Sequence, residues 1–193
     1  MRKLTQADIK DLREYERERD AFRSEIIAMK KKRRIHVGDI VTIVFENAAT
    51  MRFQIQEMAR VERMLRDEQI AHEIATYNEL IPEDGELSGT MFIEIDDPQA
   101  LRYWLPRLTR IQDYVHIEVG GERVPAQETD EDRLTREEEM TTTVHYLRFA
   151  FTEAQRRAFG EGPVAIVVDH PAYQARTELT EDQREEIAGD FAA

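Results

Sequence analysis

The sequence predicts an α+β protein with a long N-terminal helix, a mostly antiparallel sheet of about seven strands, and helices packed on that sheet. Strand-like segments alternate with helical segments of unequal length along the 193 residues. Two turn signals between strands, Gly120-Gly121 and residues 169–172, favour hairpins and therefore antiparallel pairing. We predict one domain over residues 1–193, with an N-terminal helical arm at residues 1–34.

The N-terminal segment has the pattern of one long helix over residues 5–32. Apolar residues recur there at steps close to 3.6, with alternating charges between them. Thr5 followed by Asp8 is typical of a helix start. A basic run at residues 30–34 ends the helix, where cations complement the helix dipole. We expect that run to lie against the acidic remainder of the chain or against an acidic partner.

The next segment joins a buried strand to two helices. Residues 40–45 are almost continuously apolar, which is typical of a central strand covered on both faces. Asn47 is a favourable cap for the helix that follows. A second helix is expected over residues 68–79, before Pro82. The first of these helices is expected to bury one apolar stripe, formed by Met51, Ile55, Met58, Val61 and Leu65.

The second half of the chain predicts the remaining strands and short helices. Strands are expected at residues 90–95, 114–119, 123–127, 141–151, 164–168 and 173–178. Asp97 and Pro98 are typical of a helix start, and two further helices are expected at residues 153–159 and 180–191. Residues 130–139 are rich in acids and hold one apolar residue, so we expect an acidic mobile loop there.

Composition and charge exclude several partners and chemistries. The net charge is −13, and it divides into +5 for residues 1–34 and −18 for the remainder. Phosphates and anionic membranes repel an acidic protein, so we expect neither nucleic acid nor membrane as a partner. The lack of cysteine excludes disulfides, thiol catalysis and iron–sulfur clusters within this chain. With no secretory signal and no long apolar run, we predict a soluble cytoplasmic protein.

The common catalytic and cofactor motifs are missing. No glycine-rich phosphate loop occurs, and neither serine lies in a Gly-x-Ser-x-Gly turn. Glu68 and His72 share one helix face, but their spacing differs from the Glu-x-x-His of di-iron bundles. A solvated face is the favoured interpretation, and we expect no metal and no other cofactor.

A small set of polar residues is a candidate ligand-binding site, although no catalytic role can be assigned. Gln54 and Glu57 either form a structural network or face a ligand. His145 shares a strand face with Leu147 and Phe149, which favours a structural role. The turn at residues 169–173 is either a rigid loop or the rim of a site. The candidate residues are Glu46, Asn47, Gln54, Glu57, His145, Arg148, His170 and Tyr173.

Five short segments, in order along nearly the whole chain, carry a family resemblance. They are Val44-Phe45-Glu46-Asn47, Gln54-Ile55-Gln56-Glu57-Met58 with Glu62, Tyr77-Asn78-Glu79-Leu80-Ile81-Pro82, Val144-His145-Tyr146-Leu147-Arg148-Phe149 and Asp169-His170-Pro171-Ala172-Tyr173. The chain thereby resembles the bacterial family named domain of unknown function 3501 (DUF3501). That family has no established activity, so the resemblance transfers no catalytic residue. Its genes often lie beside those of rubrerythrin-like and iron–sulfur redox proteins, which implies an accessory role near electron transfer or peroxide defence.

Two function classes follow from these observations. The first is a non-enzymatic accessory or interaction protein that serves a redox partner, and it predicts an exposed apolar or charged patch. The alternative is a small-ligand-binding protein or an enzyme, with a polar pocket around Phe45-Glu46-Asn47 and the Gln54–Glu57 segment, and it predicts that these side chains converge in one cavity. The sequence also leaves a homo-oligomer open.

Overall fold

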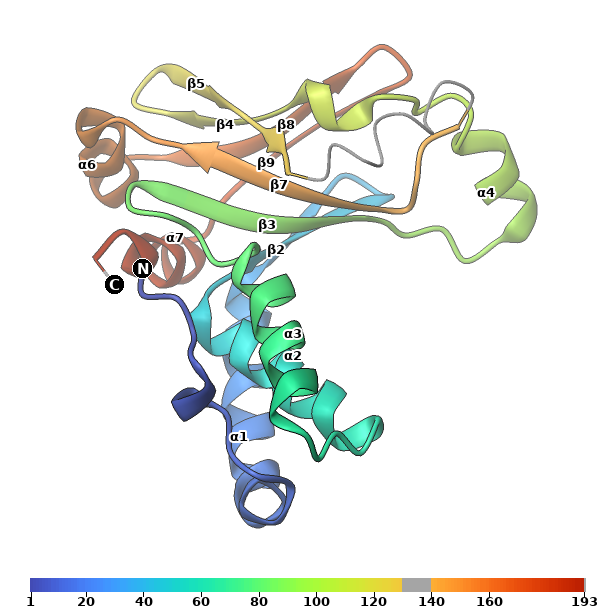
Figure 1. Cartoon of the computed structure of the whole chain (residues 1–193). Coiled ribbons are helices and arrows are strands. Elements are labelled where there is room, and N and C mark those ends of the chain that lie inside the picture. The colour runs from blue at the N-terminus through green and yellow to red at the C-terminus, as the bar shows by residue number, and fades with distance from the viewer. Residues whose placement is uncertain (130–139, 193) are drawn as a thin grey trace.

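Two antiparallel sheets packed face to face form the body of the protein. A computed structural model of the chain describes residues 1–129 and 140–192. The first sheet has the order β1-β2-β3-β7-β6 and the second β5-β4-β8-β9, and every neighbouring pair is antiparallel (Figure 1). The strands of the first sheet are β1 (Arg34–Val37), β2 (Val41–Glu46), β3 (Glu86–Ile93), β6 (Gln127–Glu128) and β7 (Val144–Ala150). Those of the second are β4 (Val115–Val119), β5 (Glu122–Pro125), β8 (Val164–His170) and β9 (Tyr173–Glu178).

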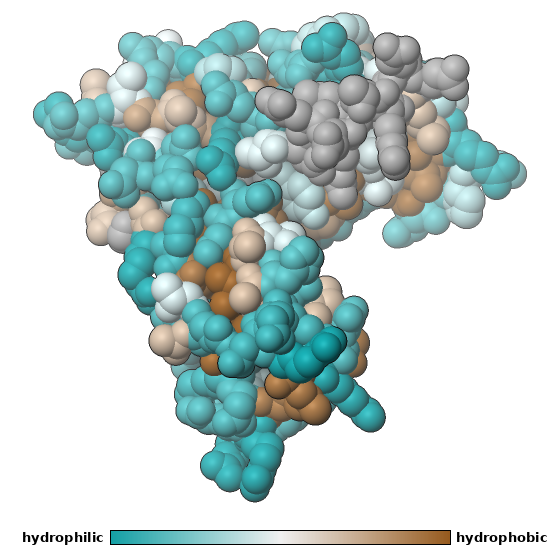
Figure 2. All heavy atoms as spheres, viewed as in Figure 1, coloured by the Kyte–Doolittle hydropathy of each residue, from teal (hydrophilic) through white to brown (hydrophobic). Residues whose placement is uncertain are grey.

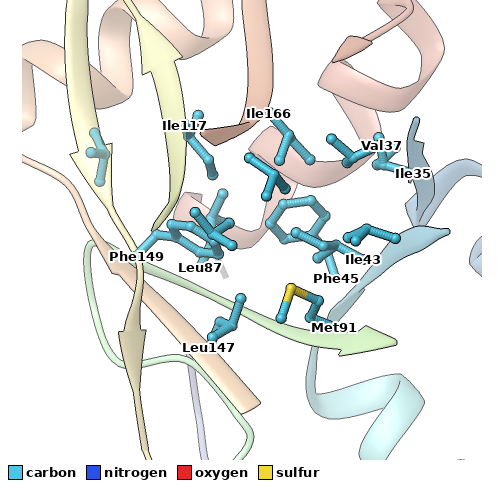
Figure 3. Close-up of a cluster of buried hydrophobic side chains, with 14 of the residues drawn as sticks. Ile35, Val37, Ile43, Phe45, Leu87, Met91, Ile117, Leu147, Phe149 and Ile166 are labelled. Atoms are coloured by element: carbon cyan, nitrogen blue, oxygen red, sulfur yellow. The ribbon is translucent and has the colours of Figure 1, made fainter. Parts of the chain in front are cut away.

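The main hydrophobic core lies between the two sheets. Strand side chains alternate between faces, so every second residue of β2 points into this space, as Ile43 and Phe45 do (Figure 3). Phe149 of β7 meets Phe45 with ring centroids 6.1 Å apart, and Ile117 and Ile166 reach the core from the opposite sheet. The outer face of β2 is covered as well, because α1 packs against it, and all six residues of the strand are buried.

Three helices form a helical arm that projects from the outer face of the five-stranded sheet (Figure 1). They are α1 (Leu12–Arg33), α2 (Ala48–Val61) and α3 (Asp67–Asn78). The predicted helix over residues 5–32 begins later than expected, at Leu12. Asp11 caps it by accepting from the amides of Arg13 and Glu14. The Thr5 capping box closes only a short 3₁₀ turn, η1 (Gln6–Asp8), after which Ile9 is extended.

Shorter helices close the two ends of the body. At one end lie α6 (Glu153–Glu161), α7 (Glu181–Ala188) and the 3₁₀ turn η3 (Gly189–Ala192) (Figure 1). Phe151, Phe159 and Phe191 make edge-to-face contacts there, with centroids 5.1–5.8 Å apart. At the other end lies α4 (Pro98–Trp104), capped by Asp97, while the 3₁₀ turn η2 (Ile111–Tyr114) leads into β4.

The α+β class, the N-terminal helix and the mostly antiparallel pairing are confirmed. The strands are nine among the described residues, and they form two sheets. The hairpin at Gly120-Gly121 is confirmed, with φ values of 57° and 79° at the two glycines. The expected acidic loop at residues 130–139 lies outside the described residues. Within the described part of the chain, every helix is too short or too polar to span a bilayer.

Candidate functional site

The structure separates the polar residues that the sequence groups around Glu46. Glu46, Ser88 and Arg148 stand in one row across β2, β3 and β7, on the outer face of the five-stranded sheet. Two strand spacings, about 10 Å, separate Glu46 from Arg148. Arg148 donates to the Glu79 carbonyl at 2.5 Å and lies 3.5 Å from Glu86. The buried Glu46 lies 3.9 Å from Lys30, so each of the two charges already has a different partner.

His145 lies on the other face of β7 from Arg148, because residues three apart on a strand point in opposite directions. It is fully buried, with Nδ1 2.9 Å from a Glu128 carboxylate oxygen and Nε2 3.0 Å from the Thr141 hydroxyl. The strand that holds His145 and Arg148 therefore cannot bring both into one pocket.

His170 and Tyr173 hold a turn together. The Ala172 amide donates to His170 Nδ1 at 3.1 Å, so the ring proton lies on Nε2, which donates to the Thr109 carbonyl at 3.2 Å. The Tyr173 hydroxyl donates to the Val37 carbonyl at 2.6 Å and ties the β8–β9 hairpin to β1. The polar atoms of both side chains hydrogen-bond to backbone groups, as is typical of residues that make a loop rigid.

Asn47 belongs to a buried ion-pair cluster at the base of the arm. It caps α2 by accepting from the Thr50 amide, and its side-chain amide donates to Asp190 at 3.4 Å. Arg33 is fully buried, pairs with Asp190, and donates to the Phe45 carbonyl at 2.8 Å. Burial raises the pKa of the Asp190 carboxyl, while Arg33 acts in the opposite direction. The cluster fastens the last turn of α1 to η3.

The basic run at residues 30–34 is held largely by the body of the same chain. Arg33 pairs with Asp190, Lys30 lies near Glu46, and Arg34 pairs with Glu94. The other two members, Lys31 and Lys32, are exposed.

Gln54, Gln56 and Glu57 form three different connections within the arm. Gln54 hydrogen-bonds the hydroxyl of Tyr77, whose pKa is raised by burial. Gln56 is only 2% exposed, and it accepts from the Lys10 amide at 2.7 Å and donates to the Lys10 carbonyl at 3.2 Å. It therefore fixes the segment before α1 through the backbone groups of one residue.

Glu57 joins α2 to α1. Arg19 donates to both of its oxygens at 2.8 Å, and the Tyr15 hydroxyl donates at 2.7 Å. The hydrogen bond from Arg19 is the main cause that lowers the pKa of Glu57 to about 2, and burial raises the pKa of Tyr15. These contacts are those of a structural network between helices.

Gln56→Ala and Glu57→Ala are expected to act on different contacts. Gln56→Ala leaves both backbone groups of Lys10 without a partner, which should lower the free energy of unfolding by about 1–3 kcal/mol. Glu57→Ala removes an ion pair whose two side chains are each 22% exposed and can turn to solvent, so its cost should be smaller, about 1 kcal/mol. Urea denaturation of both variants measures the difference, and equal, small effects would mean that Gln56 supports no buried contact.

The turn between α2 and α3 exposes apolar side chains that the sequence analysis assigned to a buried stripe. We call residues 60–67 the arm tip. Val61 is 71% exposed and Leu65 81%, whereas Met51 and Ile55 of the same expected stripe are buried. The stripe prediction was wrong at its end, because Val61 is the last residue of α2 and Leu65 lies beyond the helix. Figure 2 shows apolar surface on the lower part of the arm.

A tight backbone motif holds the arm tip in place. The Met64 amide donates to the Ala59 carbonyl at 2.9 Å and the Arg63 amide to the Arg60 carbonyl at 3.4 Å, which is the Schellman pattern of a helix end. Arg63 has φ 51° at the position where this motif favours glycine. Met64 is buried, so it anchors the turn while its neighbours stay exposed. The sequence analysis missed this helix end because Arg63 occupies the position where such an end usually has glycine.

The arm and the body carry opposite charge. Residues 1–34 and 48–81, which build the arm, hold 16 Lys or Arg and 13 Asp or Glu, a net charge of +3. The rest of the chain holds 11 and 27, a net charge of −16. Five of the sixteen cations belong to the basic run at the base of the arm, so an acidic molecule is repelled less by the arm than by the body.

The comparisons with known proteins identify the family. The family model described as "Protein of unknown function (DUF3501)" matches residues 3–191. No curated protein matches the chain. A crystal structure of a novel protein of unknown function from Burkholderia pseudomallei K96243 is 32% identical, covers 98% of this chain and 99% of its own, and superimposes with a TM-score of 0.89. The chain belongs to the DUF3501 family, whose function is unknown.

Proposed function

We propose that this protein is a non-enzymatic interaction protein that binds a partner protein through the arm tip. The observation that carries the proposal is the exposure of Val61 and Leu65 on a turn that the backbone holds rigid. Ordering costs of binding fall when the contact surface is already fixed in its bound shape. Two large apolar side chains exposed on one fixed turn fit this role better than they fit an inert surface.

The partner is expected to be an acidic protein, and we propose that it is a redox protein. The acidic character is supported only by the difference between the arm, +3, and the body, −16, because an acidic partner is repelled less by the arm than by the body. The redox character is supported by the family resemblance, which implies an accessory role beside rubrerythrin-like and iron–sulfur proteins. The lack of cysteine in this chain fits a helper rather than an electron carrier.

The arrangement of the polar residues favours this proposal over the ligand-binding alternative. Glu46, His145 and His170 lie on different faces and turns of the body. Most of the candidate side chains serve backbone or interhelical contacts, as Asn47, Glu57 and Tyr173 do. A pocket for a small molecule needs such groups to converge, so their separation supports an interaction protein.

Affinity capture with the full-length protein tests the proposal. The bait is wild type, the double variant Val61→Asp/Leu65→Asp, or the control Ile27→Asp, incubated with lysate of the native host at low salt. Ile27 is 40% exposed and lies on α1, about 22 Å along the helix from Leu12. Captured proteins are identified by mass spectrometry and assayed for iron.

We expect an acidic, iron-containing redox protein to bind wild type and the Ile27→Asp control, and to be lost from the double variant. Its capture should also fall at high salt, because exposed charges are screened beyond about 10 Å at 0.1 M ionic strength and over shorter distances at higher salt. Capture of that protein by the double variant as well as by wild type would contradict the proposal that the partner binds through the arm tip. Failure of wild type to capture any redox protein would overturn the redox role.

A further inference from the structure

The arm tip is too small to hold a stably bound partner by itself. A standard protein–protein interface buries about 800 Å² on each partner and takes about 20–30 residues from it. The arm tip, residues 60–67, has eight residues, and Val61 and Leu65 are its two large exposed apolar side chains. A partner that stays bound must therefore also contact this protein at another surface.

The end of the body that carries α4 exposes a second apolar surface. Tyr103 is 52% exposed, more than any other aromatic side chain that the structure describes, and half-buried Trp104 meets it edge to face at 5.5 Å. Arg107 lies over the Tyr103 ring, 3.7 Å from its centroid, and donates to the Tyr103 carbonyl at 2.7 Å. We call Tyr103, Trp104 and Arg107 the corner patch. Figure 2 shows apolar surface at this end of the body.

The corner patch has the composition and the rigidity of a binding surface. Trp, Tyr and Arg are enriched among the few residues that carry most of the binding energy in protein interfaces. Trp104 also meets Tyr173 edge to face at 6.2 Å, and the Tyr173 hydroxyl is bonded to the Val37 carbonyl. These contacts fix the patch before a partner binds, which lowers the ordering cost of binding, as at the arm tip.

The arm tip and the corner patch border the same open angle of the molecule. The turn between α2 and α3 lies on the side of the arm toward α4 (Figure 1), and Figure 2 shows the hollow between the arm and that end of the body. Asp97, which begins α4, follows Ser88 at the base of the arm by nine residues, at most about 30 Å of extended chain. On the other side of the angle, the 14 residues of α2 span about 21 Å. The two surfaces are therefore roughly 35 Å apart.

We infer that the partner is a folded globular domain that lies in this angle and contacts the arm tip and the corner patch at the same time. The inference rests on the proposed function and names the second contact surface and the kind of partner that fits both. A domain of about 100 residues has a radius of gyration of about 13 Å and is therefore about 34 Å across, which matches the separation. A helical peptide of about 15 residues is about 22 Å long and cannot reach both surfaces.

Photo-crosslinking in lysate of the native host tests whether one protein touches both surfaces. The variants Leu65→p-benzoylphenylalanine and Tyr103→p-benzoylphenylalanine place a photoreactive side chain at the arm tip and at the corner patch. Tyr114→p-benzoylphenylalanine is the matched control, since Tyr114 is 40% exposed and leads into β4 of the other sheet. Cross-linked proteins are identified, and the linked segments are mapped, by mass spectrometry.

We expect the same protein to be cross-linked from positions 65 and 103, through two separate segments of one folded domain, and not from position 114. Cross-linking of that protein from position 65 alone would overturn the inference and leave the proposed function standing. Cross-linking from position 103 alone, or from neither position, would overturn both. Linkage to a single continuous segment of about 15 residues or fewer, or equal linkage from position 114, would also overturn the inference.

Affinities for the purified cross-linked partner measure the two contacts separately. Leu65→Ala and Tyr103→Ala should each weaken binding by at least about tenfold, a loss of about 1.4 kcal/mol. The two factors should multiply to about a hundredfold in the combined variant, because sites more than about 10 Å apart act independently. Circular dichroism establishes that each variant is folded. A folded Tyr103→Ala variant that binds as tightly as wild type would overturn the inference.

Discussion

Replacing Asp190 by alanine is expected to lower the free energy of unfolding by about 3–5 kcal/mol, because it leaves the Arg33 guanidinium buried without its carboxylate. The loss should be large because Arg33 is fully buried and cannot turn to water without opening the base of the arm. The same change removes the contact between Asn47 and η3. Chemical denaturation followed by circular dichroism measures the effect.

Glu186→Ala is the matched control. Glu186 lies 3.3 Å from Arg33 but is 25% exposed, so its removal should cost about 1 kcal/mol or less. The double variant Arg33→Met/Asp190→Leu should recover part of the loss, since it removes both charges together. A free energy of unfolding for Asp190→Ala equal to that of Glu186→Ala would show that Arg33 reaches solvent.

Gly38→Ala is expected to destabilise the fold by about 3 kcal/mol. Gly38 has φ 72°, where an L side chain costs about 1–2 kcal/mol. A Cβ there would also collide with the Tyr173 hydroxyl and lie 2.9 Å from the Cβ of Ala175. Displacement of Tyr173 breaks its hydrogen bond to the Val37 carbonyl, which adds about 1–2 kcal/mol.

Gly121→Ala separates the two causes. Gly121 has φ 79°, and a Cβ there would meet no atom within 4 Å, so this variant reports the backbone cost alone. The difference in the free energy of unfolding between the two alanine variants then measures the close approach of Tyr173. Equal effects would mean that Tyr173 moves aside freely.

Local sequence patterns correctly predicted the helices and strands for which the segment carries a single structural signal. The almost continuously apolar run at residues 40–45 predicted β2 (Val41–Glu46), because such a run is stable only where both faces of the strand are covered. Asn47 and Asp97 cap helices as expected, because their side chains reach the free amides of the first turn. At the start of α1 two caps competed, and Asp11 began the helix while Thr5 closed only a short turn.

The division into two sheets and the buried ion pair depend on contacts between distant parts of the chain. Arg33 and Asp190 are 157 residues apart, and nothing in either neighbourhood distinguishes Arg33 from the exposed Lys31 and Lys32. The strand order likewise reflects pairing between segments that no turn connects, such as β3 with β7.

The sequence alone could have shown that His145 and Arg148 do not share a pocket. Side chains alternate between the two faces of a strand, so residues three apart point in opposite directions. The arm tip was missed for a local reason. The apolar spacing continues through Val61 and Leu65, while the backbone leaves the helix at Arg63, a residue that rarely marks such an end.

Arg63→Gly tests most directly whether the arm tip is a binding surface. Glycine relieves the cost of φ 51° but adds freedom to the unfolded chain, so the free energy of unfolding should rise by about 0–1 kcal/mol. Binding of the captured redox partner, measured by titration calorimetry, should weaken by about tenfold or more, a loss of about 1.4 kcal/mol. A stable variant that binds more weakly is the result that we predict, and unchanged affinity in both Arg63→Gly and Val61→Asp/Leu65→Asp would contradict the account.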